Sequence, residues 1–253
     1  MKLSLCINSV TGDMPRADAI RLAKKLGYPA IEFWEGGGAD FDPAPIKAVV
    51  DETGITVAAM GFARGLVDPA TRPEFLESVK RSLANAKILG AKGIIVVTGD
   101  ELEGVSRCAQ HDSIVDGLKE AAKIVAGSGI PLLLEPLNLL VNHAGYYLEK
   151  SCEAFEIVRK VGSPDVKVLF DIYHQQISEG NLIANITNNI DLIGHFHVAG
   201  NPGRGEPYFG EINYCEVFAA ADKAGYKGYA GLECWPKVDS AEECLKKCIE
   251  LYG

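Results

Sequence analysis

The chain has 253 residues, of which 47% are hydrophobic and 23% are charged, and its formal net charge is −9. These proportions are those of an ordinary globular protein, which excludes disordered and fibrous classes. An acidic surface repels phosphate groups, so we expect no nucleic-acid partner. No stretch approaches the ~18 apolar residues of a membrane span, and the first residues form too short an apolar run for a signal peptide.

The seven cysteines are scattered along the chain and form no C-x-x-C pair. Cys244 and Cys248 are the closest two, and their spacing of four is typical of one helix face. A zinc cluster or a disulfide framework is therefore not expected, and a reducing cytoplasm is the simplest location.

Short apolar runs alternate with longer amphipathic segments from one end of the chain to the other. Most of the runs are apolar throughout, which is typical of parallel strands that are covered on both faces. We expect strands at residues 3–7, 30–34, 56–62, 93–97, 131–135, 166–171, 192–198 and 229–233.

The amphipathic segments predict helices, several of which have a glycine where the helix should stop. Asp13 and Pro15 precede the first of them, and Gly27 follows it. The expected helices cover residues 16–27, 42–54, 72–90, 112–129, 151–162, roughly 181–190, 213–225 and 240–253.

Eight strand-then-helix units in a chain of this length predict an α/β fold, a single-domain (β/α)₈ TIM barrel over residues 1–253. An open, doubly wound sheet is the alternative. That fold normally has a glycine-rich phosphate loop after its first strand, whereas the turn here reads NSVTGDMP and has no G-x-G-x-x-G.

Polar residues collect at the ends of the last four expected strands. These residues are Glu135, Asp171, His197 and Glu233. The carboxyl ends of barrel strands form the active site, so the four side chains should meet. A single carboxylate there could be a salt bridge or a helix cap. Three of them around one point demand a cation, and Mn²⁺ or Mg²⁺ suits this mixed oxygen and nitrogen set, with Co²⁺ or Zn²⁺ as alternatives.

Two histidines share the seventh strand, DLIGHFHVAG, and side chains two residues apart point to the same side of a sheet. His197 is nearer the strand end and is the expected ligand. His195 should lie one layer deeper, either in the core or behind the ligand. His174 follows Asp171 by three residues, so we expect it in a loop facing the substrate, with a surface-loop histidine as the alternative.

The loop after the seventh strand is long and polar, as in many lids over barrel mouths. Its Arg204 could hold a substrate carboxylate or hydroxyl groups, or be a solvated surface arginine. Glu211 could contact substrate or stabilise the start of the next helix. Trp34 could form an apolar wall of the pocket or belong to the core. Weaker candidates in the early loops are Asn8, Glu35 and Arg64.

Two glutamates on either side of a divalent cation suit proton transfer next to a carbonyl group. One glutamate removes a carbon-bound proton and the other returns it. Return to the neighbouring carbon is aldose–ketose isomerisation, and return to the opposite face is epimerisation. The chain has no G-x-S-x-G, Walker or H-E-x-x-H motif that would support another chemistry.

The segments LLLEPLN, FDIYHQQISEGNL, HFHVAGNPGRGEPYFGEINY and GLE resemble the hydroxypyruvate isomerase family. That family belongs to the xylose isomerase-like barrel superfamily, as do ketose 3-epimerases. The resemblance implies that Glu135, Asp171, His197 and Glu233 bind the metal. It further implies that Glu135 and Glu233 are the acid/base pair, and that His174 and Arg204 contact substrate. The chain departs from the family pattern at His197, where these isomerases usually have Gln and ketose 3-epimerases have His.

We therefore expect a metal-dependent isomerase for a small oxo acid or sugar, with a ketose 3-epimerase as the alternative. Endonuclease IV shares the superfamily, but it needs additional zinc-binding histidines and a basic groove for DNA. A non-catalytic barrel is a further possibility, and the carboxylate and histidine set argues against it. The expected partner is a small-molecule substrate, without nucleic acid or membrane, in a homo-oligomer.

Overall fold

The computed structural model describes residues 1–253, apart from the side chain of Phe62. Eight parallel strands pair in chain order, and β8 pairs with β1 to close a barrel, as predicted. The strands are β1 (Lys2–Cys6), β2 (Ala30–Phe33), β3 (Thr56–Arg64), β4 (Ile94–Val97), β5 (Leu132–Leu134), β6 (Val166–Asp171), β7 (Ile193–Val198) and β8 (Tyr229–Leu232).

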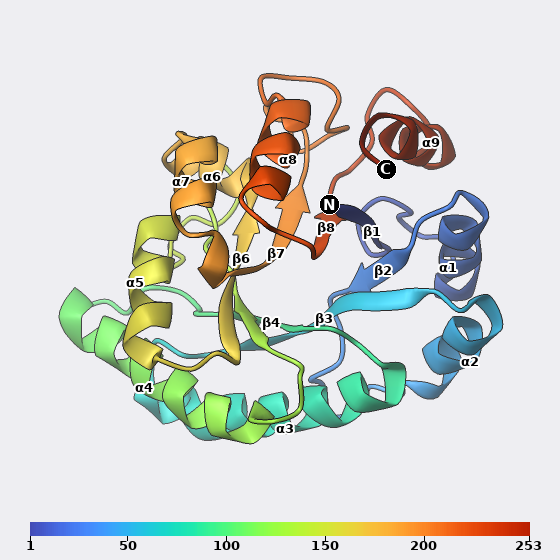
Figure 1. Ribbon diagram of the computed structural model, residues 1–253. Helices are drawn as coiled ribbons and strands as arrows, with labels where there is room; N and C mark the ends of the chain where they lie inside the picture. The colour runs from blue at the N-terminus through green and yellow to red at the C-terminus, as the bar shows by residue number, and fades with distance from the viewer.

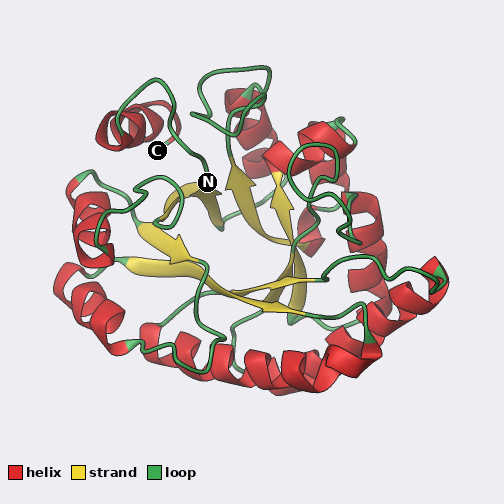
Figure 2. Ribbon diagram, turned by 180° about the vertical axis from the view of Figure 1, so that it is seen from behind, coloured by secondary structure: helices red, strands yellow, loops and turns green.

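Helices surround the barrel as an outer ring, and long loops join them to the strands (Figures 1 and 2). The α-helices are α1 (Arg16–Lys25), α2 (Ala44–Thr53), α3 (Arg72–Leu89), α4 (Arg107–Val125), α5 (Ser151–Val161), α6 (Ile172–Ser178), α7 (Leu182–Asn188), α8 (Tyr214–Lys223) and α9 (Ala241–Tyr252). Two short 3₁₀ turns, η1 (Pro69–Thr71) and η2 (Ile190–Leu192), complete the described elements.

One predicted helix begins earlier than expected and one helix was not predicted, and both differences concern N-terminal caps. Helix α4 begins at Arg107 rather than near residue 112, because the Ser106 side chain accepts the N–H of Ala109 and caps it. Helix α6 was not expected. It forms because Asp171 Oδ1 accepts the N–H of His174 at 2.9 Å, so the last residue of β6 starts a helix.

The helices pack on the barrel through apolar stripes with helical spacing. On α3, Phe75, Val79 and Ala86 are fully buried and face the strands, and the helix ends at Gly90 in the left-handed conformation. Each large apolar side chain buried in this way stabilises the fold by about 1.5–3 kcal/mol. This large core between helices and strands fixes the barrel and thereby the positions of the strand ends.

The inside of the barrel is filled differently on its two sides. Ala59, Ile95, Leu133 and Leu169, from β3, β4, β5 and β6, form a small apolar cluster of their own. On the other side the buried interior is polar, with Glu32 from β2 and His195 from β7 in contact. The four candidate ligands lie two residues beyond Leu133, Leu169, His195 and Gly231, so strand alternation turns them toward the same interior.

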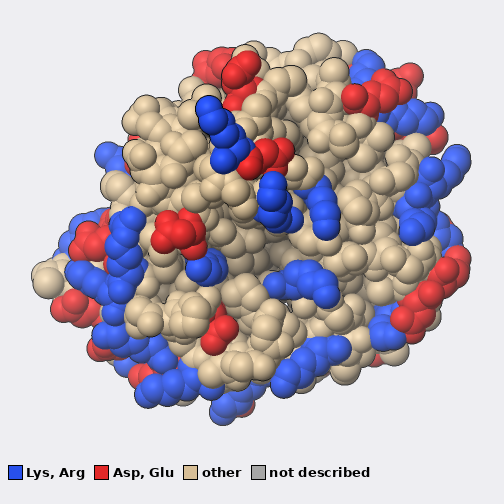
Figure 3. All heavy atoms as spheres, in the orientation of Figure 1, with Lys and Arg blue, Asp and Glu red and all other residues tan. Residues whose placement is uncertain are grey.

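None of the helices in the described chain is long and apolar enough to cross a membrane. On the face of the molecule drawn in Figure 3, basic and acidic side chains are interspersed. All seven cysteines are free thiols, of which Cys108, Cys152 and Cys215 are exposed.

Candidate active site

The barrel brings the four predicted ligands together at its carboxyl end. Glu135 and Glu233 directly follow β5 and β8, and the strand register places Asp171 of β6 beside His197 of β7. Each of the four residues offers one ligand atom, and these atoms all lie within 4.8 Å of one another. All four side chains are buried. Their role as metal ligands remains a prediction, but the geometry it requires is present.

The imidazole of His197 lies among the three carboxylates. Its Nδ1 atom is 3.0 Å from Glu135 Oε1, 3.4 Å from Glu233 Oε2 and 4.0 Å from Asp171 Oδ2. Because Asp171 Oδ1 caps helix α6, its Oδ2 atom is the one that faces the group. Three carboxylate oxygens and one ring nitrogen form a donor set that suits a divalent cation.

Burial and neighbouring charges separate the proton affinities of the two glutamates. Burial raises the pKa of Glu135 above its ordinary value, despite the attraction of His197. For Glu233, burial acts in the same direction, but the charges of Arg204 and His197 outweigh it and lower its pKa. Two carboxyl groups in one site with pKa values moved in opposite directions are the arrangement expected of an acid and a base.

Arg204 is built into the site, so the alternative of a solvated surface arginine is wrong. Its Nη2 atom donates to Glu233 Oε2 and lies 3.8 Å from Asp171 Oδ2. The guanidinium lies over the rings of Tyr173 and Trp235, at 5.4 Å and 4.9 Å from their centroids. Only 13% of the side chain is exposed. These contacts neutralise part of the negative charge of the carboxylates.

His174 lies in α6 and is fully buried, so the expected position in a loop is wrong. Its Nδ1 atom accepts the backbone N–H of Asn138 at 3.2 Å, which leaves the ring hydrogen on Nε2. That Nε2 atom has no hydrogen-bond partner in the described structure and lies 3.6 Å from Asp171 Oδ2. Burial lowers the pKa of His174 well below its ordinary value, so the ring is a neutral donor beside the site.

Trp34 and Glu211 have different surroundings. The indole Nε1 of Trp34 donates to Glu233 Oε1 at 2.8 Å, and the ring lines a cavity of about 290 Å³ with Glu135, Glu233 and Arg204. Glu211 is exposed and accepts from Asn201 and Gln176, and it is not among the residues that line this cavity. Its contact with substrate remains a prediction.

Sequence reasoning missed several residues of the cavity wall. Leu137, His143 and Trp235 complete its lining. Leu137 and His143 also line an adjoining cavity of about 690 Å³, which includes Arg64. Leu137, His143 and Trp235 lie in loops, where no strand or helix periodicity could indicate which side chains face inward, whereas Arg64 ends β3.

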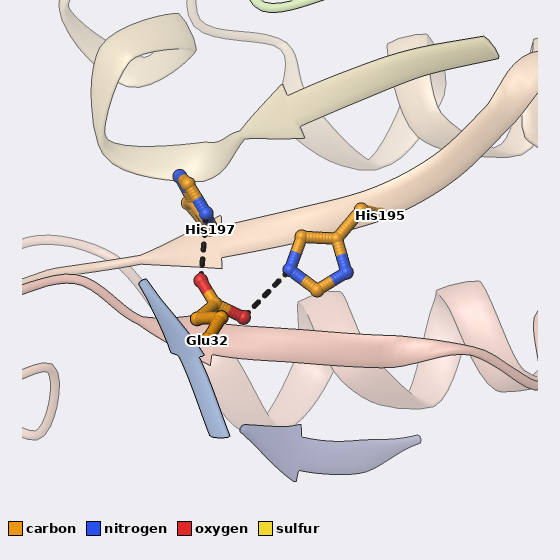
Figure 4. Close-up of side chains that lie close together, drawn as sticks. All are labelled: Glu32, His195 and His197. Atoms are coloured by element: carbon orange, nitrogen blue, oxygen red, sulfur yellow. Dashed lines mark hydrogen bonds and ion pairs between the residues drawn. The ribbon is translucent and has the colours of Figure 1, made fainter. Parts of the chain in front are cut away.

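Glu32 was also missed, although the sequence carried a signal. It is a carboxylate in the middle of the buried strand AIEF, and it contacts both His195 and His197 (Figure 4). Burial opposes its ionisation, but the two histidines outweigh burial and lower the pKa of Glu32 to about 2.

Glu206 connects the two loops that follow β7 and β8. Its carboxylate lies in the loop after β7 and accepts the backbone N–H groups of residues 237, 238 and 239 in the loop after β8.

Comparison with known proteins agrees with the barrel fold. The family described as Xylose isomerase-like TIM barrel matches residues 20–250. The hydroxypyruvate isomerase of Escherichia coli K12 is 36% identical over 246 residues, which cover 94% of each chain. The chain belongs to the hydroxypyruvate isomerase family. Another member, the 2-oxo-tetronate isomerase of Cupriavidus necator, is 31% identical over 236 residues and 88% of each chain. The protein is accordingly an isomerase of this family.

Solved structures of the same fold carry several different names. A protein from Brucella melitensis titled AP endonuclease, family 2, is 27% identical and covers 99% of both chains, with a TM-score of 0.91. D-allulose 3-epimerase from Methylomonas sp. is 19% identical, covering 99% of this chain and 95% of its own, with a TM-score of 0.83. The second likeness shows the fold alone.

Proposed function

We propose that the protein is a metal-dependent isomerase that interconverts an α-hydroxy ketone and an aldehyde through an enediolate. Hydroxypyruvate, which would give tartronate semialdehyde, and related small oxo acids are the proposed substrates. The observation that carries the proposal is the pair of buried glutamates, Glu135 and Glu233, within one set of ligand atoms no more than 4.8 Å apart. The relatives named hydroxypyruvate isomerase and 2-oxo-tetronate isomerase support the substrate class.

The residues present fit a divalent metal ion. Three buried carboxylates around His197 carry more negative charge than the neighbouring Arg204 compensates, and buried charges need a partner. Glu135, Asp171, His197 and Glu233 would hold the ion, with Mn²⁺ or Mg²⁺ favoured over Co²⁺ or Zn²⁺. When bound, the ion would supply Lewis acidity to a carbonyl oxygen next to a hydroxyl group.

The two glutamates would then move the proton. Glu233 is kept ionised by Arg204 and receives the Trp34 N–H, so it is held in place as the base that removes the carbon-bound proton. Glu135, whose carboxyl group lies in the same set of ligand atoms, would return a proton to the neighbouring carbon, while the proton of the substrate hydroxyl group would pass to the former carbonyl oxygen. The contacts of Arg204 and Trp34 with Glu233 favour this division of roles.

Other residues would bind and orient the substrate. The Nε2–H of His174 is a buried donor without a partner in the described structure, so it can bind a substrate oxygen. The cavity of about 290 Å³ accommodates a three- or four-carbon acid. The adjoining cavity offers Arg64, which forms no ion pair among the described residues, as a cation for a substrate carboxylate.

A ketose 3-epimerase is the second candidate function. The adjoining cavity of about 690 Å³ leaves room for a five- or six-carbon sugar, which favours a longer substrate. His197 stands at the position where ketose 3-epimerases have histidine and hydroxypyruvate isomerases usually have glutamine. The same glutamate pair would then return the proton to the opposite face of the same carbon.

We also infer that the partners are small molecules, without nucleic acid or membrane, and that the protein acts in the cytoplasm, where its free cysteines stay reduced. A homo-oligomer is proposed because Leu140 and Val141 are 80% and 61% exposed in the loop after β5.

NMR spectroscopy in D₂O tests the proposed reaction. Metal-loaded protein is incubated with hydroxypyruvate and then with a small panel of ketoses, and Glu135→Gln and Glu233→Gln serve as controls. Formation of deuterated tartronate semialdehyde by the wild type alone supports the isomerase. Exchange of a carbon-bound proton only in a ketose supports the epimerase. Absence of exchange with every metal and substrate would contradict the glutamate-pair mechanism.

A further inference from the structure

Below the candidate ligands lies a second buried group, formed by Glu32, His195 and His197. Glu32 extends from β2 into the barrel and its carboxylate points at both imidazoles (Figure 4). Oε2 of Glu32 is 2.9 Å from Nε2 of His195, and Oε1 is 2.8 Å from Nε2 of His197. None of the three side chains is more than 2% exposed. Water therefore cannot substitute for these contacts.

The contact between Glu32 and His197 is exclusive on both sides. Oε1 of Glu32 lies 2.8 Å from Nε2 of His197, but the angle between the two groups is not that of a hydrogen bond. Neither atom has a hydrogen-bond partner elsewhere in the described structure. The other ring nitrogen of His197, Nδ1, faces Glu135, Glu233 and Asp171. The ring thus stands between two groups, with one nitrogen for each.

A glycine on β8 makes room for the carboxylate. A Cβ atom added to Gly231 would lie 2.1 Å from Glu32 Oε1, 2.4 Å from its Cδ and 2.5 Å from Oε2. Gly231 is paired with His197 in the strand register, so the space lies directly beside the ligand strand. His195 holds Oε2, which prevents the carboxylate from rotating away from His197.

We propose that Glu32 is a positioning residue for the metal site, an inference that rests on the proposed function. It holds the hydrogen of His197 on Nε2 and fixes the ring plane, so that Nδ1 presents its lone pair to the ion held by Glu135, Asp171 and Glu233. A carboxylate behind a metal-binding histidine sets both its tautomer and its orientation. His195 acts through Glu32, which explains why β7 carries two histidines on one side.

The three residues could instead hold a second ion, and the distances argue against this. Both nitrogens are in direct contact with the carboxylate, at 2.8 Å and 2.9 Å. Tetrahedral ligand atoms about 2.1 Å from a shared ion would lie roughly 3.4 Å apart. Metal stoichiometry decides between the two arrangements: positioning predicts one ion per chain.

Two variants test the proposal. Glu32→Gln removes the charge in nearly the same volume, and Gly231→Ala displaces the carboxylate without removing any titratable group. The matched control is Gly93→Ala, whose Cβ would lie 2.5 Å from Leu133 Cδ1, on the apolar side of the same interior. Circular dichroism and thermal unfolding identify variants that fail to fold.

The first readout is Mn²⁺ affinity, measured by competition with a fluorescent chelator. We expect Glu32→Gln and Gly231→Ala to bind Mn²⁺ about 10- to 100-fold more weakly and Gly93→Ala to bind as the wild type does. Equal affinity in all four proteins would overturn the proposal. So would two ions per wild-type chain with one lost in Glu32→Gln.

The second readout is the tautomer of His197, from long-range ¹H–¹⁵N NMR spectra of protein loaded with diamagnetic Mg²⁺. We expect the hydrogen on Nε2 in the wild type and a loss of that preference in Glu32→Gln. If the wild type binds no divalent metal, the proposed function fails; if it binds one ion and both Glu32→Gln and Gly231→Ala bind that ion equally well, only the positioning role fails. An identical His197 signal in the wild type, Glu32→Gln and Gly231→Ala would refute the positioning role.

Discussion

Replacing Glu206 by alanine is expected to destabilise the barrel mouth, because this carboxylate ties the loop after β8 to the loop after β7. A single oxygen, Oε1, accepts the backbone N–H groups of residues 237, 238 and 239 at 2.9, 2.8 and 2.9 Å. A hydrogen bond to a charged group contributes about 1.5–3 kcal/mol. Residues 237 and 238 are exposed, so water replaces part of this in the variant. We expect the free energy of unfolding to fall by about 2–4 kcal/mol.

Thermal and urea unfolding measure this loss. For a chain of this size the fall corresponds to about 4–16 °C in melting temperature. Glu206→Gln is the matched control, because its amide oxygen can still accept the three hydrogen bonds without the charge, and it should lose about half as much. A Glu206→Ala protein that melts with the wild type at pH 7 would refute the reasoning.

The pH dependence of the difference has a definite sign. Burial opposes ionisation of Glu206, but the three backbone donors outweigh it and lower its pKa from 4.5. The stabilisation is therefore complete above pH ~4.5 and is lost as the pH falls through the lowered pKa of the folded protein. The difference in free energy of unfolding between the wild type and Glu206→Gln should therefore shrink as the pH is lowered. A difference that stays constant with pH would contradict this.

Three further changes separate individual contacts. Trp34→Phe keeps an aromatic wall but removes the N–H donor to Glu233, so kcat should fall about tenfold in steady-state assays without loss of melting temperature. Asn138→Ala removes the side-chain amide 2.6 Å from Nδ1 of His174 and keeps the backbone N–H donor, and we expect KM to rise about fivefold with a smaller effect on kcat; an unchanged KM would show that the backbone N–H alone holds the ring. Gly210→Ala should lower the free energy of unfolding by about 1–3 kcal/mol, because φ is +100° and the new Cβ would lie 2.2 Å from a backbone oxygen. Gly12→Ala, with φ +54° and open space, is the control and should lose less.

The strand ends could be predicted from the sequence because parallel strands in a barrel share one polarity. Residues that close successive apolar runs must then meet at one end, whatever the details of the helices. Glu135, Asp171, His197 and Glu233 satisfy this rule, and the structure brings them together. The side of the strand on which each residue lies could also be predicted, because the alternation of side chains along a strand places all four in the barrel interior.

Contacts across the barrel could not be predicted in the same way. Glu32 of β2 meets the histidines of β7 only because the closed barrel places the two strands on facing sides of one interior. The register and the space left by Gly231 decide that contact, and neither is visible in a linear pattern. The position of His174 was predicted wrongly for a local reason. Asp171 was expected to act only as a ligand, but one of its oxygens also caps helix α6, which places His174 in a helix instead of a loop.

The unequal filling of the barrel interior has a consequence for how the protein can change over evolutionary time. The apolar side, formed by Ala59, Ile95, Leu133 and Leu169, needs only volume and tolerates exchange among aliphatic residues. The polar side depends on the mutual orientation of particular groups, so a single exchange there disturbs its neighbours. Variation among descendants should therefore accumulate on the β3–β6 side of the interior and in the outer loops. New substrates would be acquired by changes in those loops, while the polar side of the barrel interior changes slowly.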